Sequence, residues 1–194
     1  ITATLQHNYG LHPAINIDDL VDLGSIEVIA TDTDGDTVAG TANISVSDDV
    51  PSISAGGSAA GMLVADETDL SANATADFST LFNVILGADQ AGSSIAYRFD
   101  VTTASGLVDV ATGSKIILQA SGNIVEGRLQ DSPSTVAFRL TVEADGHATL
   151  DQMRAIKHPD ATNPDDSLSL SSTLIRLTAT VTDGDGDSAA ATVA

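Results

Sequence analysis

Four stretches of the chain alternate apolar and polar residues with a period of two. Successive side chains of a β-strand point to opposite sides, so this alternation is typical of a strand that buries one face. We therefore predict half-buried antiparallel strands at these positions. The stretches are residues 37–46, 95–102, 135–142 and 175–182.

Two further stretches, 115–119 and 123–130, predict a hairpin that turns at Ser121-Gly122. Helical signals are short. Thr149 and Gln152 have the spacing of a capping box, which predicts a helical turn just after them, and residues 77–85 predict another short turn. The predicted fold is all-β, an antiparallel β-sandwich of the immunoglobulin or cadherin kind with one or two short helices.

One pattern occurs twice in the chain. Residues 26–37 end in the sequence Asp-Thr-Asp-Gly-Asp-Thr, and residues 177–188 end in Asp-Gly-Asp-Gly-Asp-Ser. The upstream residues repeat too: His12-Pro13 and Asp18-Asp19 recur as His158-Pro159 and Asp165-Asp166. So long a period is typical of whole domains in tandem, not of a solenoid.

The predicted boundary between the two copies falls at Asp48-Asp49-Val50-Pro51. Pro51 forces the residue before it into an extended conformation, and residues 52–60 are mostly Ser, Ala and Gly. We predict that residues 1–49 are the C-terminal part of a preceding β-sandwich repeat, ending in an acidic linker. Residues 50–194 are predicted to be one complete calcium-binding β-sandwich domain.

The charge of the chain narrows the possible partners. Of its 27 acidic residues 23 are aspartates, against only 7 basic residues, and the net charge is −20. No Lys or Arg precedes Arg98. Such a surface repels nucleic acids and anionic lipids, so neither is an expected partner. There is no cysteine, and no apolar stretch is long enough to predict membrane insertion.

The two acidic turns are the strongest chemical signal. Three short carboxylates at alternate positions around a glycine turn can converge on one hard cation, and Ca²⁺ prefers such oxygen ligands. An EF-hand is excluded, because Thr37 and Ser188 occupy the position where that loop needs glycine. A plain polar turn is the alternative. The predicted metal ligands are Asp32, Asp34, Asp36, Asp183, Asp185 and Asp187.

Four other acids are weaker candidates. Asp48 and Asp49 on the linker, with Asp66 and Glu67 beyond it, could share a calcium ion with the preceding turn and stiffen the joint. The alternative is a solvated acidic linker.

Five of the seven basic residues lie between Arg128 and Arg176. Arg154 and Lys157 are therefore candidates for binding a ligand carboxylate, alone or beside a bound calcium ion. Asp165 and Asp166 on the following loop are further candidate ligand-binding residues. Internal ion pairing is the alternative. No nucleophilic cysteine, phosphate loop or zinc-protease motif is present, so we do not expect an enzyme.

Several segments resemble the long repeats of RTX adhesins, very large bacterial surface proteins exported by type I secretion. They are Asp48-Asp49-Val50-Pro51, Val64-Ala65-Asp66-Glu67-Thr68, Val125-Glu126-Gly127 and residues 179–188. The glycine-rich β-roll repeats that name that family are absent from this chain. The resemblance implies a secreted cell-surface location, β-sandwich domains strung end to end, calcium-dependent folding, and attachment to cells or surfaces, as in biofilms.

Two functions follow from that resemblance. The first is a calcium-dependent adhesin domain that binds a peptide, its terminal carboxylate or a glycan on another cell or surface. The second is a passive extender, stiffened by calcium and by neighbouring repeats, that projects other binding domains. The long loops between Asp145 and Ser172 favour the first.

Overall fold

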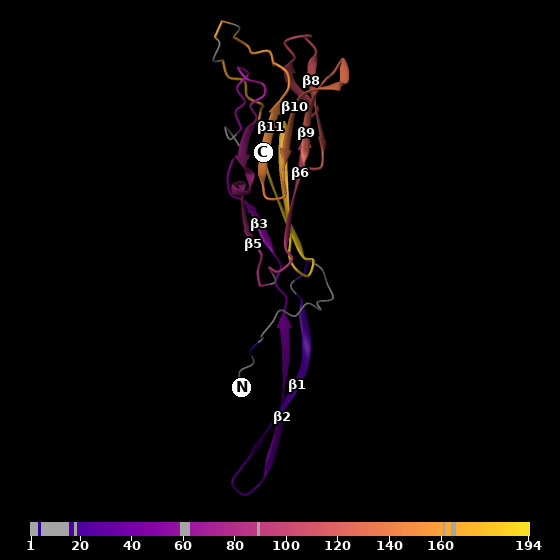
Figure 1. The fold of residues 1–194 in the computed structure, drawn as a ribbon. Helices are drawn as coiled ribbons and strands as arrows, with labels where there is room; N and C mark the ends of the chain where they lie inside the picture. The colour runs from indigo at the N-terminus through magenta and orange to yellow at the C-terminus, as the bar shows by residue number, and fades with distance from the viewer. Residues whose placement is uncertain are drawn as a thin grey trace. The chain divides into compact units, whose positions relative to one another are not determined.

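The computed structural model describes residue 4 and residues 16–17, 19–58, 63–88, 90–160, 162–163 and 166–194. The chain divides into two compact units (Figure 1). Unit 1 consists of Ile1–Ser52, Ile85–Ser94 and Thr182–Ala189. Unit 2 consists of Ile53–Val84, Ile95–Val181 and Ala190–Ala194. The division at residues 49 and 50 that the sequence suggests stays a prediction.

The main element of unit 1 is a long hairpin. Strands β1 (Leu20–Thr31) and β2 (Thr37–Ser47) form a two-stranded antiparallel sheet, with Thr31 opposite Thr37 at the turn. The register shifts once, between Asp22 and Gly24. The predicted strand at 37–46 is therefore present, and the first acidic turn lies at the tip of the hairpin.

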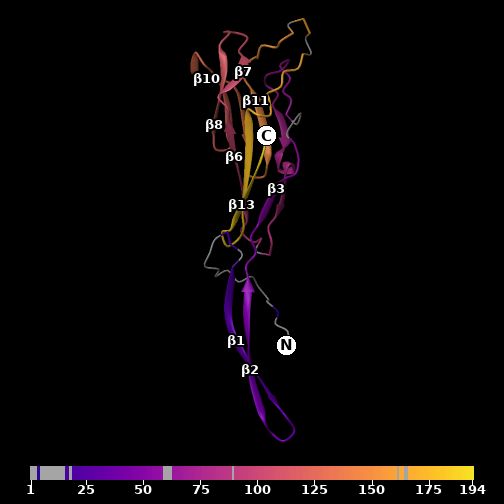
Figure 2. The ribbon, with the colours of Figure 1, turned by 180° about the vertical axis from the view of Figure 1, so that it is seen from behind.

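Unit 2 is organised around a six-stranded sheet in the order β4-β11-β10-β9-β8-β7. Figure 2 labels β7, β8, β10 and β11 of this sheet. Each neighbouring pair in it is antiparallel. The sheet is predominantly a meander, in which consecutive strands lie beside one another, and this suits short turn connections. Its strands are β4 (Ala74–Asp77), β7 (Ala104–Val108), β8 (Lys115–Ser121), β9 (Ile124–Leu129), β10 (Ser132–Val142) and β11 (His147–Gln152).

A three-stranded sheet has the order β13-β12-β6, with β6 (Ser94–Val101), β12 (Ile175–Thr182) and β13 (Ser188–Val193). Strands β3 (Ser52–Ala55) and β5 (Phe82–Ile85) form a small separate sheet. One core cluster combines apolar side chains of the six-stranded and three-stranded sheets, among them Ile116, Leu118, Phe138, Phe99 and Leu177. The fold is thus all-β and antiparallel, consistent with a β-sandwich.

Most predicted elements are confirmed. The alternating stretches 95–102, 135–142 and 175–182 are strands β6, β10 and β12, and β8 and β9 form the predicted hairpin with Ser121 opposite Ile124. Within residues 77–85 the short turn is a 3-10 helix, η1 (Phe78–Leu81), capped by the Asp77 carboxylate, which accepts from the N–H of Ser79.

The capping-box prediction is wrong. Thr149 and Gln152 lie in strand β11, where Thr149 is opposite Thr141 on β10 and opposite Thr75 on β4. A strand with a ladder on each side satisfies all its backbone groups, and that tertiary pairing outweighs a short local helix signal. No helix in the described part of the chain is long and apolar enough to cross a membrane.

Candidate metal centres

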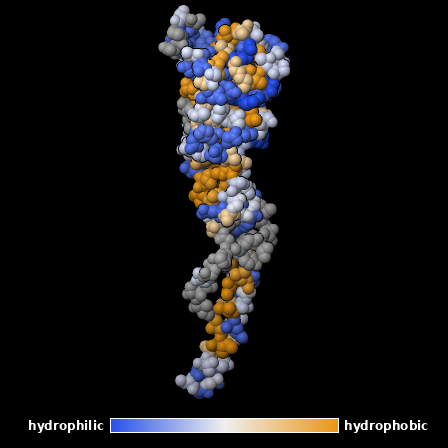
Figure 3. Space-filling view, viewed as in Figure 1, coloured by the Kyte–Doolittle hydropathy of each residue, from blue (hydrophilic) through white to orange (hydrophobic). Residues whose placement is uncertain are grey.

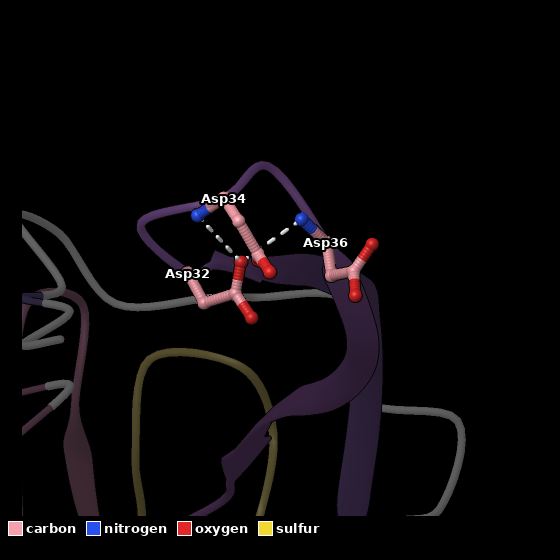
Figure 4. A group of neighbouring side chains, drawn as sticks. All are labelled: Asp32, Asp34 and Asp36. Atoms are coloured by element: carbon pink, nitrogen blue, oxygen red, sulfur yellow. Dashed lines mark hydrogen bonds between the residues drawn. The ribbon is translucent and has the colours of Figure 1, made fainter.

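The first acidic turn is an exposed loop between β1 and β2 (Figure 4). Oδ1 of Asp32 accepts hydrogen bonds from the backbone N–H groups of Asp34, Gly35 and Asp36, at 3.3, 3.1 and 2.9 Å. The N–H of Asp32 donates to the Asp36 carbonyl at 3.0 Å. A hydrogen bond with the side chain of Asp34, helped by these N–H donors, lowers the pKa of Asp32. The backbone of the turn thus supplies hydrogen bonds to the Asp32 carboxylate.

The second acidic turn, between β12 and β13, has the same backbone but different surroundings. The N–H of Asp183 donates to the Asp187 carbonyl, again at 3.0 Å, and the N–H of Gly186 donates to Asp183 Oδ1 at 3.2 Å. Here, however, Asp183 and Asp187 are only 4% and 3% exposed. Their Oδ2 atoms are buried without a hydrogen-bond partner.

Burial has an electrostatic consequence at this second turn. Desolvation, followed by a hydrogen bond with the side chain of Asp185, raises the pKa of Asp183. A buried carboxylate oxygen without a partner costs free energy, because it has lost the water that solvated its charge. A cation bound between Asp183 and Asp187 removes that cost. The shift at Asp183 is opposite in direction to that at Asp32.

Both trios have the geometry of a possible cation site. In each, one carboxylate oxygen per residue lies within 4.8 Å of the others. The three aspartates that the sequence analysis grouped in each turn therefore do lie close together, while their binding of a metal stays a prediction. The two trios differ in one respect, because the second also contains the buried, unpartnered Oδ2 atoms of Asp183 and Asp187. The second turn is therefore the stronger candidate for a cation site.

Asn16 also belongs to the second turn, a contact that the sequence analysis missed. Its N–H donates to Oδ1 of Asp187, and its side-chain Oδ1 accepts from the N–H of Ser188 at 2.5 Å. Asn16 has a φ of 61°, in the left-handed region that asparagine tolerates better than most residues. No local sequence signal links residues so far apart, so this pairing was not predictable.

The linker acids have other contacts. Asp48 is buried, and its Oδ1 accepts from the N–H of Asp49 at 3.0 Å. Oδ2 of Asp49 accepts from the N–H of Ala88, which ties the linker to the loop after β5. Within the described residues, neither acid belongs to a group of three carboxylates.

Asp66 and Glu67 brace a loop of unit 2. Asp66 Oδ1 accepts from the N–H of Thr68 at 2.9 Å. Oε1 of Glu67 accepts from Gln152 Nε2 and from the N–H of Ile156, the latter at 2.9 Å, and lies 3.7 Å from His158 Nε2. Glu67 thus holds the segment after β11, and neither acid joins a metal trio in the part of the chain that is described.

Arg154 is engaged in an ion pair. Its Nε donates to Asp109 Oδ1 at 2.7 Å and its Nη2 donates to Asp109 Oδ2 at 3.0 Å. Asp109 is 1% exposed and also accepts from the N–H and hydroxyl of Thr112. These bonds, that from Arg154 first, hold the pKa of Asp109 far below its ordinary value. This is the internal pairing that the sequence analysis kept as an alternative.

The other candidate ligand-binding residues do not gather around Arg154. Lys157 is exposed, and its N–H donates to the carbonyl of Val108 at 2.7 Å. Asp166 Oδ2 accepts from the N–H of Asp160 at 2.9 Å. Asp165 lies outside the described residues.

Unit 2 contains a cavity of about 840 Å³. Phe78, Phe99 and Phe138 contribute aromatic walls, and the loop segments 63–68 and 166–172 line it as well. Glu67, Gln152 and His158 add a polar side. A volume of this size is within the range of small-molecule and side-chain pockets.

Comparison with known proteins gives one match. Searches among curated proteins and among solved structures found no match. The family described as a domain of unknown function (DUF5801) matches residues 62–194. Because that match covers more than half of the chain, the protein belongs to the DUF5801 family.

Proposed function

We propose that this protein is a calcium-stabilised extender domain of a secreted bacterial adhesin of the RTX type. The resemblance of its acidic segments to the repeats of those adhesins supports this assignment. The observation that carries it is the second acidic turn, where Asp183 and Asp187 are buried with oxygens that lack partners. A net charge of −20 adds to the need for a cation.

Calcium fits this turn better than other common cations. All the side chains offered are carboxylates, which hard cations prefer over nitrogen or sulfur ligands. A glycine turn is compliant, and Ca²⁺ accepts irregular coordination, whereas Mg²⁺ demands near-ideal octahedral geometry. Extracellular calcium modules bind with dissociation constants on the order of 10⁻⁴ to 10⁻³ M, so such a site fills outside the cell and empties inside.

The test is thermal unfolding of the chain in excess calcium and in EDTA. One site at about 100 times its dissociation constant adds roughly 2.7 kcal/mol. For a protein of this size that is a rise of about 5–10 °C in melting temperature. Magnesium at the same concentration is expected to give a smaller rise. Identical melting curves in calcium and EDTA would rule out the proposal.

The two turns supply matched variants for that experiment. Asp183→Asn and Asp32→Asn change the same position of the same turn. Asp183→Asn is expected to remove most of the calcium-dependent rise, because it weakens the buried trio. Asp32→Asn is expected to leave most of it. A larger loss of the calcium-dependent rise in Asp32→Asn than in Asp183→Asn would contradict a calcium site at the buried turn.

Ligand binding is the second candidate, favoured by the cavity in unit 2. A peptide with an apolar C-terminal residue could place that side chain among Phe78, Phe99 and Phe138, with its carboxylate towards His158, which lines the cavity and follows the exposed Lys157 in the sequence. The pairing of Arg154 with Asp109 removes the strongest anion-binding group from this role, which is why the extender is preferred.

Labelled peptides that end in a free carboxylate or in an amide test this second candidate by fluorescence anisotropy. Ligand binding predicts that the free carboxylate binds more tightly and that Lys157→Ala removes the difference. Arg98→Ala is the control, since Arg98 is exposed and pairs with Asp100. Absence of binding to either peptide leaves the extender role.

A further inference from the structure

The hairpin β1–β2 is a structural duplicate of the hairpin β12–β13. The turn bond from Asp32 to Asp36 has the same length as that from Asp183 to Asp187. Beyond the turn the register also agrees. Glu27 is opposite Thr41, and their counterparts Thr178 and Thr192 join hydroxyl to hydroxyl at 2.8 Å.

One face of the hairpin β1–β2 is apolar along both strands. Val28 is opposite Gly40 on this face, and the next positions alternate to the other side. The apolar face carries Ile26, Val28, Ala30, Val38, Gly40, Ala42 and Ile44. The opposite face carries Ser25, Glu27, Ile29, Thr31, Thr37, Ala39, Thr41 and Asn43. A hairpin with one continuous apolar face is built to cover a core.

The two hairpins differ in what covers that face. Ala179 on β12 is 0% exposed and belongs to the core cluster, whereas its counterpart Val28 is 44% exposed. Strand β12 also lies between β13 and β6, whereas β1 pairs with β2 alone in the described structure. Figure 3 shows apolar side chains gathered along the hairpin of unit 1.

On β1 the three apolar-face residues carry as many side-chain carbons as their counterparts on β12. Ile26 occupies the position that corresponds to Leu177. Val28 and Ala30 correspond to Ala179 and Val181, so the larger and the smaller side chain have exchanged places between these two positions. Volume-conserving exchanges are the ones that cores tolerate best.

The duplication also extends upstream of the hairpin in the sequence. Ala3-Thr4-Leu5 repeats Ala148-Thr149-Leu150 of strand β11. Residues 2–43 thus follow the pattern of residues 147–194, while the chain contains the pattern of residues 53–146 once. That single segment includes β6 and most of the core residues that cover β12–β13.

We propose that the hairpin β1–β2 is the closing hairpin of a second body built like residues 53–146. The strand equivalent to β6 pairs with the free edge of β1, and the apolar face of the hairpin seals that body's core. The partner is thus a domain of this same family that lacks a closing hairpin of its own. This goes beyond the proposed function and does not depend on calcium.

The test adds such a body to the chain. A copy of residues 53–146 is joined to Thr2, so that its Gly146 precedes Thr2 as Gly146 precedes His147. The extended protein is expected to gain a second folded body, and the amides of β1 and β2 are expected to exchange at least 100-fold more slowly than in the chain of 194 residues. An added body that stays unfolded beside the hairpin would overturn the proposal.

Val28→Asp and Ile29→Asp are the matched variants, on opposite faces of the same strand. In the extended protein Val28→Asp is expected to unfold the added body, whereas Ile29→Asp is expected to leave it folded. Neither should alter the melting of the unextended chain, where both side chains are exposed. Equal effects of the two variants would contradict the proposal. If the unextended chain forms dimers and Val28→Asp abolishes them, a second copy of the chain covers the apolar face instead.

Discussion

Arg154 and Asp109 form a two-bonded ion pair that joins two segments of unit 2, with Nε and Nη2 of the arginine at 2.7 and 3.0 Å from the carboxylate. Backbone bonds flank the pair, from the N–H of Val110 to the carbonyl of Ala155 and from the N–H of Lys157 to the carbonyl of Val108. The segment after β11 is thereby fixed to the end of β7.

Arg154→Ala is expected to destabilise the protein, because it leaves the buried Asp109 carboxylate without its main partner. We expect the melting temperature to fall by about 5–10 °C. Arg98→Ala is the control, since the exposed Arg98–Asp100 pair is screened by water and should change the melting temperature by roughly 1 °C at most. Equal effects of the two changes would contradict a structural role for Arg154.

Acid should weaken the protein partly through Asp109. Its pKa is lower in the folded state than the ordinary 3.8, so the unfolded chain takes up a proton first as the pH falls. The stability from this carboxylate is complete above that ordinary pKa and is lost below it. Urea unfolding of the protein and of Asp109→Asn at several pH values measures this. The difference between them should shrink as the pH falls through 3.8 and below.

Without calcium, Asp183→Asn should make the protein more stable. The substitution keeps an oxygen that can accept from the N–H of Gly186. It removes the negative charge of a carboxyl group whose pKa is raised by desolvation. In EDTA we expect a melting temperature about 2–5 °C higher than that of the unchanged protein. In excess calcium the order should reverse. Asp34→Asn, in the exposed turn, should show neither effect.

Gly127 leaves room for the ring of Phe138. The two residues are direct partners across β9 and β10, and a Cβ at Gly127 would lie 2.2 Å from Cε1 of Phe138. Gly127→Ala therefore forces a core aromatic ring to move and should cost about 1–3 kcal/mol in the free energy of unfolding. Gly40→Ala, on β2, meets nothing within 4 Å and should cost little. Chemical denaturation of both variants checks the contrast.

The strands were predictable from sequence because each alternating run buries one face against a common core. Phe138 and Leu140 point inward in β10 while Arg139 between them is exposed, as period two requires. The helix expected after Thr149 failed for a nonlocal reason, the pairing of β11 with β4 as well as β10. Strand β4 has only four residues, too few for a clear alternation signal.

The residues of the two candidate cation sites were predictable from the sequence, but which of the two turns is the stronger candidate was not. Both turns show the same three aspartates, so sequence alone treated Asp32 and Asp183 as equivalent. Their difference in burial comes from tertiary neighbours such as Asn16, which local pattern does not reveal. The partner of Arg154 was equally hidden, since Asp109 is one acid among 27.

The two outer strands of the six-stranded sheet are short or irregular, and this affects how readily neighbouring molecules can pair through the sheet. Strand β4 has four residues, and β7 has five and changes register between Ala104 and Val108. Short or irregular border strands are poor templates for cross-β growth from one molecule to the next. Bodies like unit 2 that are held close together are therefore not expected to join through the borders of this six-stranded sheet.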